Sequence, residues 1–150
     1  MARYFTRVQT PWPAERAFAY VADLRNFAEW DPGVTAVEQL TGDGPGPDAA
    51  YSVTVTGAVR PMTLRYETTA YDPPRRIEVR AESSSLLSID VVTVEPVTDG
   101  AGSIVTYDAT LTFRGLARLA DPLLALGFRR IGDRAAAGLR TALEGTATTR

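Results

Sequence analysis

Asp90 is the carboxylate that the sequence places among apolar residues, and it is the first candidate for chemistry. The segment 86–95 alternates, and Glu95 is expected at its solvent edge, so alternate residues from Val94 back to Ser88 face inward. A carboxylate on an apolar face is costly unless it is hydrogen bonded or its pKa rises. Asp90 is therefore either a base or ligand anchor on an inward face, or a surface residue that a β-bulge turns outward.

Tyr66 and Tyr107 are expected on the same inward face as the apolar residues of their strands. Each hydroxyl is either a satisfied group within the core or a group that orients a ligand. The strands that carry Asp90 and Tyr107 are joined by a short turn, and counting from that turn puts Asp90 near position 108. A shift of one residue in the register would bring Asp90 beside Tyr107. We therefore predict a hydrogen bond to Asp90 from Tyr107 or Tyr66.

The residue types that are absent exclude several classes of site. The sequence has no histidine and no cysteine, and all 16 basic residues are arginine. Serine–histidine and cysteine–histidine nucleophiles, Schiff-base lysines and zinc sites built on histidine or cysteine are therefore excluded. A base near neutral pH would have to be a carboxylate with a raised pKa. We expect no metal and no cofactor.

Charge and hydropathy argue against two classes of partner. The net charge of −2 and the scattered arginines do not suit a nucleic-acid surface, and "GDGPGPD" lacks the strand-then-helix context of a phosphate-binding loop. No apolar run approaches the roughly 18 residues of a membrane span. The first residues, "MARYFTRVQT", alternate instead of forming a signal peptide. We therefore expect no nucleic-acid partner, no integral membrane association and a cytoplasmic location.

The elements that must position these residues follow one another in the order strand, two short helices, six strands, long helix. A chain of 150 residues, 45% of them hydrophobic, is long enough for a single domain with its own core, residues 1–150. Short turn-like connections such as "DPP" and "TDGAG" predict an antiparallel meander. The strands are predicted at 3–10, 34–41, 50–57, 61–71, 75–83, 86–95 and 103–113, and the helices at 11–24, 25–30 and about 116–144.

The last helix carries an apolar stripe that we expect to face the sheet. Pro122 lies inside this pattern and predicts a kink, or a late start of the helix near Asp121. The stripe consists of Leu116, Leu119, Leu123, Leu124, Phe128, Ile131, Ala135, Leu139 and Leu143.

Strand parity also predicts a solvated outer face of the sheet. Tyr71 is expected there together with the charged residues of its strand and the next. The charged residues, predicted to form cross-strand pairs, are Arg65, Glu67, Glu78, Arg80 and Glu82.

Four segments of the chain are similar to patterns of one protein superfamily. They are "VQTPWPAERAFAYVADLRNFAEWDPGV", "YDPPRRIEVR", "VEPVTDGAGSIVTY" and "DPLLALGFRR". Over essentially the whole chain the sequence resembles the SRPBCC superfamily of polyketide cyclase/dehydrase and lipid-transport proteins, which is START-related. The resemblance implies an α+β, birch-pollen-allergen-like helix-grip fold. In that fold a curved seven-stranded antiparallel sheet wraps around a long C-terminal helix, and two short helices lie between strands 1 and 2.

The resemblance also implies a cavity between the sheet and the last helix. Trp30 would seal one end of this cavity, or it would plug the core beside Phe27 and Phe18. The run Asp31-Pro32-Gly33 is expected only to turn the chain into the next strand. The residues expected to contact a ligand are Tyr66, Tyr107, Asp90, Trp30, Leu64, Val79, Val92, Leu111 and Phe128.

Three functions are compatible with this fold. The first is the binding of a hydrophobic or aromatic small molecule, lipid- or polyketide-like, oriented by the tyrosines and Asp90. The second is an enzyme, a polyketide cyclase, aromatase or dehydratase in which a tyrosine or Asp90 moves protons. The third is a non-catalytic partner protein, which no large exposed apolar stripe supports. We favour binding, because the missing histidine and lysine leave little catalytic machinery. Whether the protein is an enzyme, and whether it forms a homodimer, is left open.

Overall fold

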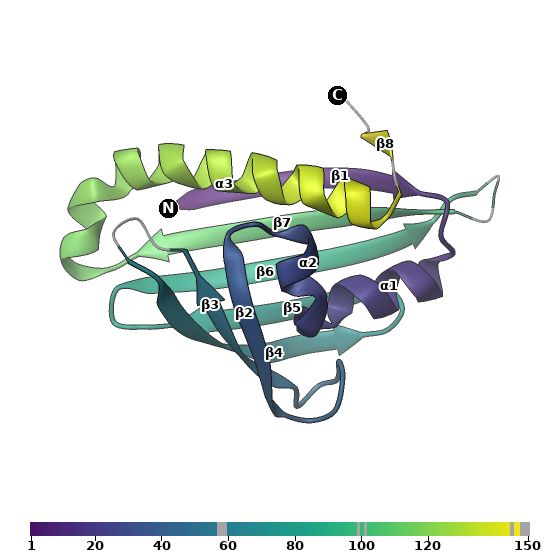
Figure 1. Cartoon of the computed structure of the whole chain (residues 1–150), viewed down its shortest axis with the longest axis horizontal. Coiled ribbons are helices and arrows are strands. Elements are labelled where there is room, and N and C mark those ends of the chain that lie inside the picture. The colour runs from purple at the N-terminus through teal and green to yellow at the C-terminus, as the bar shows by residue number, and fades with distance from the viewer. Residues whose placement is uncertain (57–59, 99, 101, 145, 148–150) are drawn as a thin grey trace.

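One antiparallel sheet forms the frame of the molecule, with the strand order β2-β3-β4-β5-β6-β7-β1-β8 (Figure 1). The computed structural model describes residues 1–56, 60–98, 100, 102–144 and 146–147. The predicted seven-stranded meander is confirmed, and a two-residue strand, β8, adds to it beyond β1. The strands are β1 (Ala2–Thr10), β2 (Val34–Thr41), β3 (Ala50–Val55), β4 (Met62–Asp72), β5 (Arg76–Glu82), β6 (Leu86–Pro96), β7 (Ser103–Phe113) and β8 (Thr146–Ala147).

Helices lie between β1 and β2 and again after β7, as the helix-grip fold requires. They are α1 (Ala14–Ala22), the 3-10 helix η1 (Leu24–Asn26), α2 (Phe27–Trp30), the 3-10 helix η2 (Gly115–Ala120) and α3 (Asp121–Ala142). Pro13 precedes the first residue of α1, and Asp23 caps η1 by accepting a hydrogen bond from the backbone N–H of Arg25 at 3.1 Å. In the described part of the chain, none of the helices is long and apolar enough to cross a membrane.

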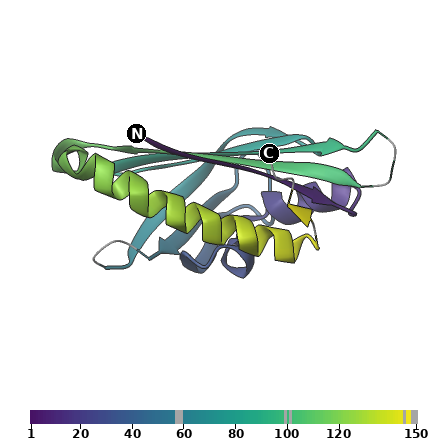
Figure 2. The same ribbon diagram turned by 90° about the horizontal axis from the view of Figure 1, so that it is seen from above.

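Two glycines allow α3 to pack closely against the other elements. A β-carbon on Gly138 would lie 1.8 Å from the carbonyl oxygen of Trp30, and one on Gly132 would lie 2.1 Å from the ring of Tyr4. α3 therefore contacts α2 through one glycine and β1 through the other. Figure 2 shows α3 running obliquely past the strands, and in Figure 1 the short helices lie below its C-terminal part.

The predicted apolar stripe is correct for the C-terminal part of α3 and for Phe128, which packs partly buried against the core, while the side chain of Leu124 lies outside the described part of the structure. Leu139 and Leu143 are buried, whereas Leu116, Leu119 and Leu123 are 86%, 83% and 77% exposed. The α-helix begins at Asp121, as Pro122 predicted, so the two leucines of η2 do not share its periodicity. At 3.6 residues per turn, Leu123 lies about 160° around the axis from Leu139. The structure thus has the exposed apolar surface that the sequence interpretation did not anticipate.

The prediction that Tyr71 lies on the outer face is wrong, because β4 contains a β-bulge before this residue. The pairing of β4 with β5 shifts between Thr68 and Ala70, so the parity of the later residues is reversed. Tyr71 therefore lies on the inner face, where its ring centroid is 5.8 Å from that of Phe18.

The charged residues of β4 and β5 on the outer face form ion pairs along each strand, not across the strands as predicted. The ion pairs Arg65–Glu67, Arg76–Glu78 and Arg80–Glu82 each join residues two apart in one strand. Side chains two apart in a strand point to the same face, which allows this arrangement. Glu82 also contacts Arg114, which follows β7.

Candidate functional site

A chain of hydrogen-bonded side chains crosses the inner face of β4, β6 and β7. Tyr66 donates to Ser88 Oγ at 3.2 Å, and Ser88 donates to Asp90 Oδ1 at 3.1 Å. Tyr107 donates to Asp90 Oδ2 at 3.1 Å. Asp90 is 5% exposed, so its two oxygens accept hydrogen bonds almost out of contact with solvent.

The register of β6 and β7 places Asp90 beside Tyr107. Asp90 pairs with Ala109, one residue beyond the predicted position 108, and Val92 pairs with Tyr107. Asp90 and Tyr107 are therefore diagonal neighbours on one face of the sheet. The pairing of β6 with both neighbouring strands runs without a bulge, so Asp90 keeps its inward direction.

Burial dominates the electrostatics of this cluster. It raises the pKa of Asp90 to about 6, against the opposing effect of the hydrogen bonds from Tyr107 and Ser88. The charge of Asp31 raises the pKa of Asp90 further. Burial also raises the pKa of Tyr107 and Tyr66 well above the usual tyrosine value, with the charge of Asp90 acting in the same direction. Both tyrosines are thus neutral hydroxyl donors at physiological pH.

Asp31 belongs to this electrostatic cluster, although the sequence predicted only a turn for it. The turn exists, since Asp31 Oδ1 accepts a hydrogen bond from the backbone N–H of Gly33 at 2.8 Å. The side chain is nevertheless buried, and burial raises its pKa to about 6. One feature of the sequence could have indicated this burial: Asp31 lies between the apolar residues Trp30 and Val34, and both of these are buried.

A small cavity of about 20 Å³ lies between this cluster and the short helices. Five of the predicted ligand-contacting residues line it, namely Trp30, Val79, Asp90, Val92 and Tyr107. Among the described residues that line this cavity, none belongs to the last helix, which was expected to form one wall; the wall opposite the sheet consists of Val21, Asp23, Leu24, Phe27 and Trp30 from the segment between β1 and β2.

The remaining predicted residues lie outside the lining of this cavity. Tyr66 is linked to it through Ser88, whereas Leu64, Leu111 and Phe128 pack in the core or at its margin. Trp30 is buried in the core beside Phe27, one of the two neighbours expected for it. Its ring packs 4.8 Å from that of Phe27 and 5.5 Å from that of Tyr107, and it also borders the cavity.

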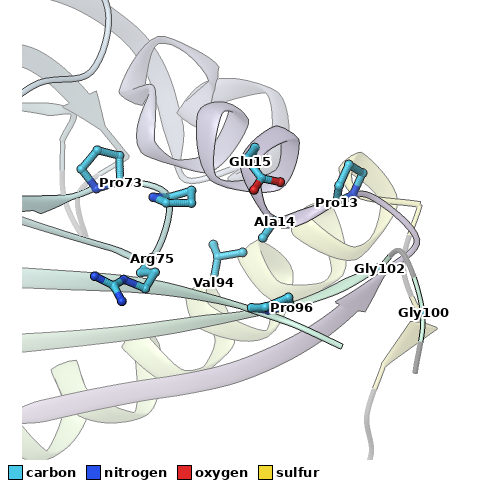
Figure 3. A pocket seen from close by; sticks show the side chains of 10 residues that line it. Pro13, Ala14, Glu15, Pro73, Arg75, Val94, Pro96, Gly100 and Gly102 are labelled. Carbon is cyan, nitrogen blue, oxygen red and sulfur yellow. The ribbon is translucent and has the colours of Figure 1, made fainter. Parts of the chain in front are cut away.

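A larger and more open groove of about 420 Å³ lies near the N-terminal end of α1 (Figure 3). Its walls come from α1, from the turn between β4 and β5, and from the end of β6. None of the predicted site residues lines it. Among the described residues of its lining, the charged side chains are Glu15 and Arg75, and the others are mostly proline, glycine and alanine. The groove therefore offers few groups for chemistry.

Carboxylates near the site do not gather into a metal centre. Within the ranges that the structure describes, no three His, Cys, Asp or Glu side chains come together as metal ligands. The described groups at the site include two carboxyl groups with a pKa of about 6 and the hydroxyls of tyrosine and serine.

Several solved structures have the same fold as this chain. The Zhui aromatase/cyclase from Streptomyces has a TM-score of 0.75 and 15% identity, with 95% of this chain and 93% of that chain covered. A START superfamily protein from Mycobacterium smegmatis has a TM-score of 0.72 and 12% identity, with 96% and 98% covered. A protein from Deinococcus radiodurans has a TM-score of 0.70 and 18% identity, with 95% of both chains covered.

The sequence itself connects the chain to a family. No curated protein matches it. A family model described as polyketide cyclase / dehydrase and lipid transport matches residues 1–144. The START and aromatase/cyclase structures that share the fold agree with that match. This chain therefore belongs to the polyketide cyclase / dehydrase and lipid transport family.

Proposed function

We propose that this protein binds a hydrophobic or aromatic small molecule on the inner face of its sheet, with a polar group of the ligand held at Asp90 and Tyr107. The observation that carries the proposal is Asp90, a buried carboxylate that borders a mostly apolar cavity. Small-molecule sites are typically apolar, with a few polar groups that fix the orientation of the ligand. The family description, which includes polyketide cyclases and lipid transport, supports a ligand of this class.

The energetic cost of Asp90 supports a functional role. A rise in pKa from 3.8 to about 6 corresponds to roughly 3 kcal/mol against the charged form in the folded protein. A neutral side chain of similar size, such as asparagine, would avoid this cost. Titratable groups that are retained in such environments are concentrated at functional sites.

Binding requires that one wall of the cavity move. The cavity of about 20 Å³ has room for about one water molecule, whereas small-molecule pockets measure roughly 300–1,000 Å³. The wall facing the sheet is formed by Leu24, Phe27 and Trp30, which belong to η1 and α2. Helices this short hold few internal hydrogen bonds. We therefore expect η1 and α2 to shift away from the sheet when a ligand enters.

Trp30 provides a direct measurement of binding. The second tryptophan, Trp12, packs against Tyr20 and Arg16 and does not line the cavity, so Trp12→Phe leaves Trp30 as the only tryptophan reporter. We expect 4-hydroxybiphenyl to change the Trp30 fluorescence saturably in this background. Adding Asp90→Asn should weaken the affinity by about tenfold, because a hydrogen bond to a charged acceptor is lost.

Asp108→Asn is the matched control, on the next strand and the outer face. Asp108 forms an exposed ion pair with Arg3 at 2.7 Å and should not affect binding. Native mass spectrometry of the gently purified protein would identify a ligand that copurifies. Unchanged affinity in folded Asp90→Asn protein would contradict the role of Asp90.

Asp90 also favours a second candidate function, proton transfer during cyclisation or dehydration of a carbonyl compound. A pKa of about 6 suits a general acid or base near neutral pH. As a base, Asp90 would remove a proton from a carbon between two carbonyl groups and leave an enolate. The hydroxyl of Tyr107, already beside the carboxylate, would be placed to donate to the enolate oxygen.

Deuterium exchange separates this function from simple binding. Benzoylacetone in D₂O exchanges its central C–H through the enolate, and proton NMR follows the loss of that signal. The protein should accelerate the exchange with an apparent pKa near 6, and Asp90→Asn should abolish the acceleration. Equal rates with and without protein would exclude proton transfer and leave binding as the function.

A further inference from the structure

We infer that the ligand site has a second polar end, formed by the hydroxyls of Tyr51 on β3 and Thr68 on β4, and that the ligand is an elongated apolar molecule with an oxygen substituent at each end. This inference rests on the proposed function and extends it, because it specifies the shape and polarity of the ligand.

The observation behind it is a pair of buried hydroxyls without partners. Within the described part of the chain, Tyr51 Oη and Thr68 Oγ1 are buried and form no hydrogen bond. Tyr51 is 0% exposed as a residue. A buried hydroxyl without a partner is destabilising, and buried polar groups in native proteins almost always have one. A polar group of a ligand would give both hydroxyls a hydrogen-bond partner.

The register of the sheet places these hydroxyls on the same face as Asp90. Thr68 pairs with Val79, and Val79 pairs with Asp90, so the three residues form one row across β4, β5 and β6. Val79 lies between the two polar residues and is part of the cavity lining. Two strand spacings separate Thr68 from Asp90, which is roughly 10 Å.

Tyr51 lies next to this row and toward the short helices. It pairs with Tyr66, so Thr68, two residues further along β4, is its diagonal neighbour on the same face. Burial raises the pKa of Tyr51 to about 12, and the charge of Asp23 acts in the same direction. Asp23 is part of the lining of the small cavity, whereas Tyr51 and Thr68 are not, so the opening of the cavity that binding requires must extend along the row to reach these two hydroxyls.

The chemistry of the two ends differs. At Asp90 the protein offers a carboxylate, which favours a ligand group that donates a hydrogen bond. At Tyr51 and Thr68 it offers two hydroxyls, which can donate or accept. Between Asp90 and Thr68 lies the apolar side chain of Val79, which lines the small cavity together with Phe27 and Trp30. A flat molecule with a hydroxyl at one end and a hydroxyl or carbonyl at the other fits this arrangement.

Two probes that differ by one hydroxyl test the inference. In 4,4′-dihydroxybiphenyl the oxygens are separated by about two strand spacings, whereas 4-hydroxybiphenyl has only one oxygen, which should go to the carboxylate of Asp90. We expect the wild-type site, measured through Trp30 in the Trp12→Phe background, to bind the dihydroxy probe about fivefold more tightly or better. Thr68→Val and Tyr51→Phe should each remove most of that advantage and leave the affinity for 4-hydroxybiphenyl within about twofold.

The stability of the free variants gives a second, independent readout. Because both hydroxyls lack partners, Thr68→Val and Tyr51→Phe should keep or raise the melting temperature of the free protein. Thr69→Val is the matched control: Thr69 is the next residue, and its hydroxyl is hydrogen bonded to Glu78 Oε1 at 2.9 Å. It should lower the melting temperature and leave the binding of both probes unchanged.

Each outcome decides a different point. If both probes bind equally well and the variants do not distinguish them, the second polar end is wrong and the proposed function stands. A clear fall in melting temperature for Thr68→Val and Tyr51→Phe would show that their hydroxyls are already bonded in the free protein, for example to water, and would overturn the inference. If neither probe binds, both the inference and the proposed function fail for aromatic ligands of this size.

Discussion

Asp90 and Asp31 are buried carboxyl groups in one electrostatic cluster, and both have a pKa of about 6. Their partners differ. Asp90 accepts hydrogen bonds from the hydroxyls of Tyr107 and Ser88, while Asp31 accepts one from the backbone of Gly33. These hydrogen bonds offset only part of the desolvation, since the pKa of each group remains raised. At neutral pH the folded protein therefore carries two carboxylates that would be better solvated in the unfolded chain.

The contribution of Asp90 and Asp31 to the free energy of unfolding should make the protein less stable at neutral pH than in mild acid. Their pKa is about 6 in the folded state and 3.8 without the protein environment. Between these values the folded state binds more protons than the unfolded state, so the free energy of unfolding falls as the pH rises. The folded state is stabilised relative to this neutral-pH condition when both carboxyl groups are protonated. This stabilisation is complete below about pH 4 and is lost as the pH rises through about 6.

Asp90→Asn should remove the part of this pH dependence that belongs to Asp90. At pH 8 we expect the variant to be more stable than the wild type by roughly 1–3 kcal/mol, because no charge is buried. The difference should shrink toward pH 4. Urea unfolding followed by circular dichroism across this range measures both effects, with Asp108→Asn as the exposed control. The same slope in wild type and Asp90→Asn would contradict the buried charge.

At the scale of the elements, α3 is held by glycines at one end and carries exposed leucines at the other. Gly138 brings the helix against the carbonyl of Trp30, so the position of α3 also fixes α2, which forms part of the cavity wall. Gly127, in the same helix, has open space around it. Substitutions at Gly138 and Gly127 therefore distinguish the effect of close packing from the effect of intrinsic helix propensity.

Alanine at these positions should act in opposite directions. Gly127→Ala should stabilise the protein by up to ~1 kcal/mol, because alanine favours a helix and nothing obstructs its methyl group. Gly138→Ala should destabilise it by about 1–3 kcal/mol or more, since the methyl group would overlap the Trp30 carbonyl. Thermal unfolding measures both, and the emission of Trp30 in a Trp12→Phe background should change only with Gly138→Ala. Equal effects at both positions would exclude the close contact.

At the scale of the whole molecule, the core is concentrated at one end. The short helices, the C-terminal half of α3 and the middle of the sheet bury most of the large side chains together. At the other end, Leu116, Leu119, Leu123 and Leu126 are more than half exposed. Burial, and with it local stability, is therefore uneven along α3.

Amide hydrogen exchange should reveal this gradient. We expect backbone amides in 135–143 to exchange only on global unfolding, because Ala135, Leu139 and Leu143 are buried. Amides in 125–131 should be at least about tenfold less protected, because the exposed leucines add few contacts that hold this part of the helix. Exchange measured residue by residue by NMR gives the comparison, and uniform protection along α3 would contradict it.

The sequence determined the features that depend on local periodicity. Alternation along 86–95 narrowed Asp90 to the inner face or to a β-bulge, and the short turn to the next strand limited its neighbours to residues around Tyr107; the regular pairing of β6 then decided for the inner face. The order of strands and helices, and the interruption at Pro122, followed from patterns within a few residues of each other. Such patterns reflect the geometry of one strand or one helix, which does not depend on the rest of the fold.

The tertiary structure decided the features that depend on contacts between distant segments. The bulge that turns Tyr71 inward arises from pairing with β5, and the burial of Asp31 arises where α2 and β2 meet beneath α3. The described residues of the cavity wall that faces the sheet likewise come from the segment between β1 and β2, and none of them belongs to α3. Residue types along the chain do not set these distances, because packing selects one arrangement among many with the same local periodicity.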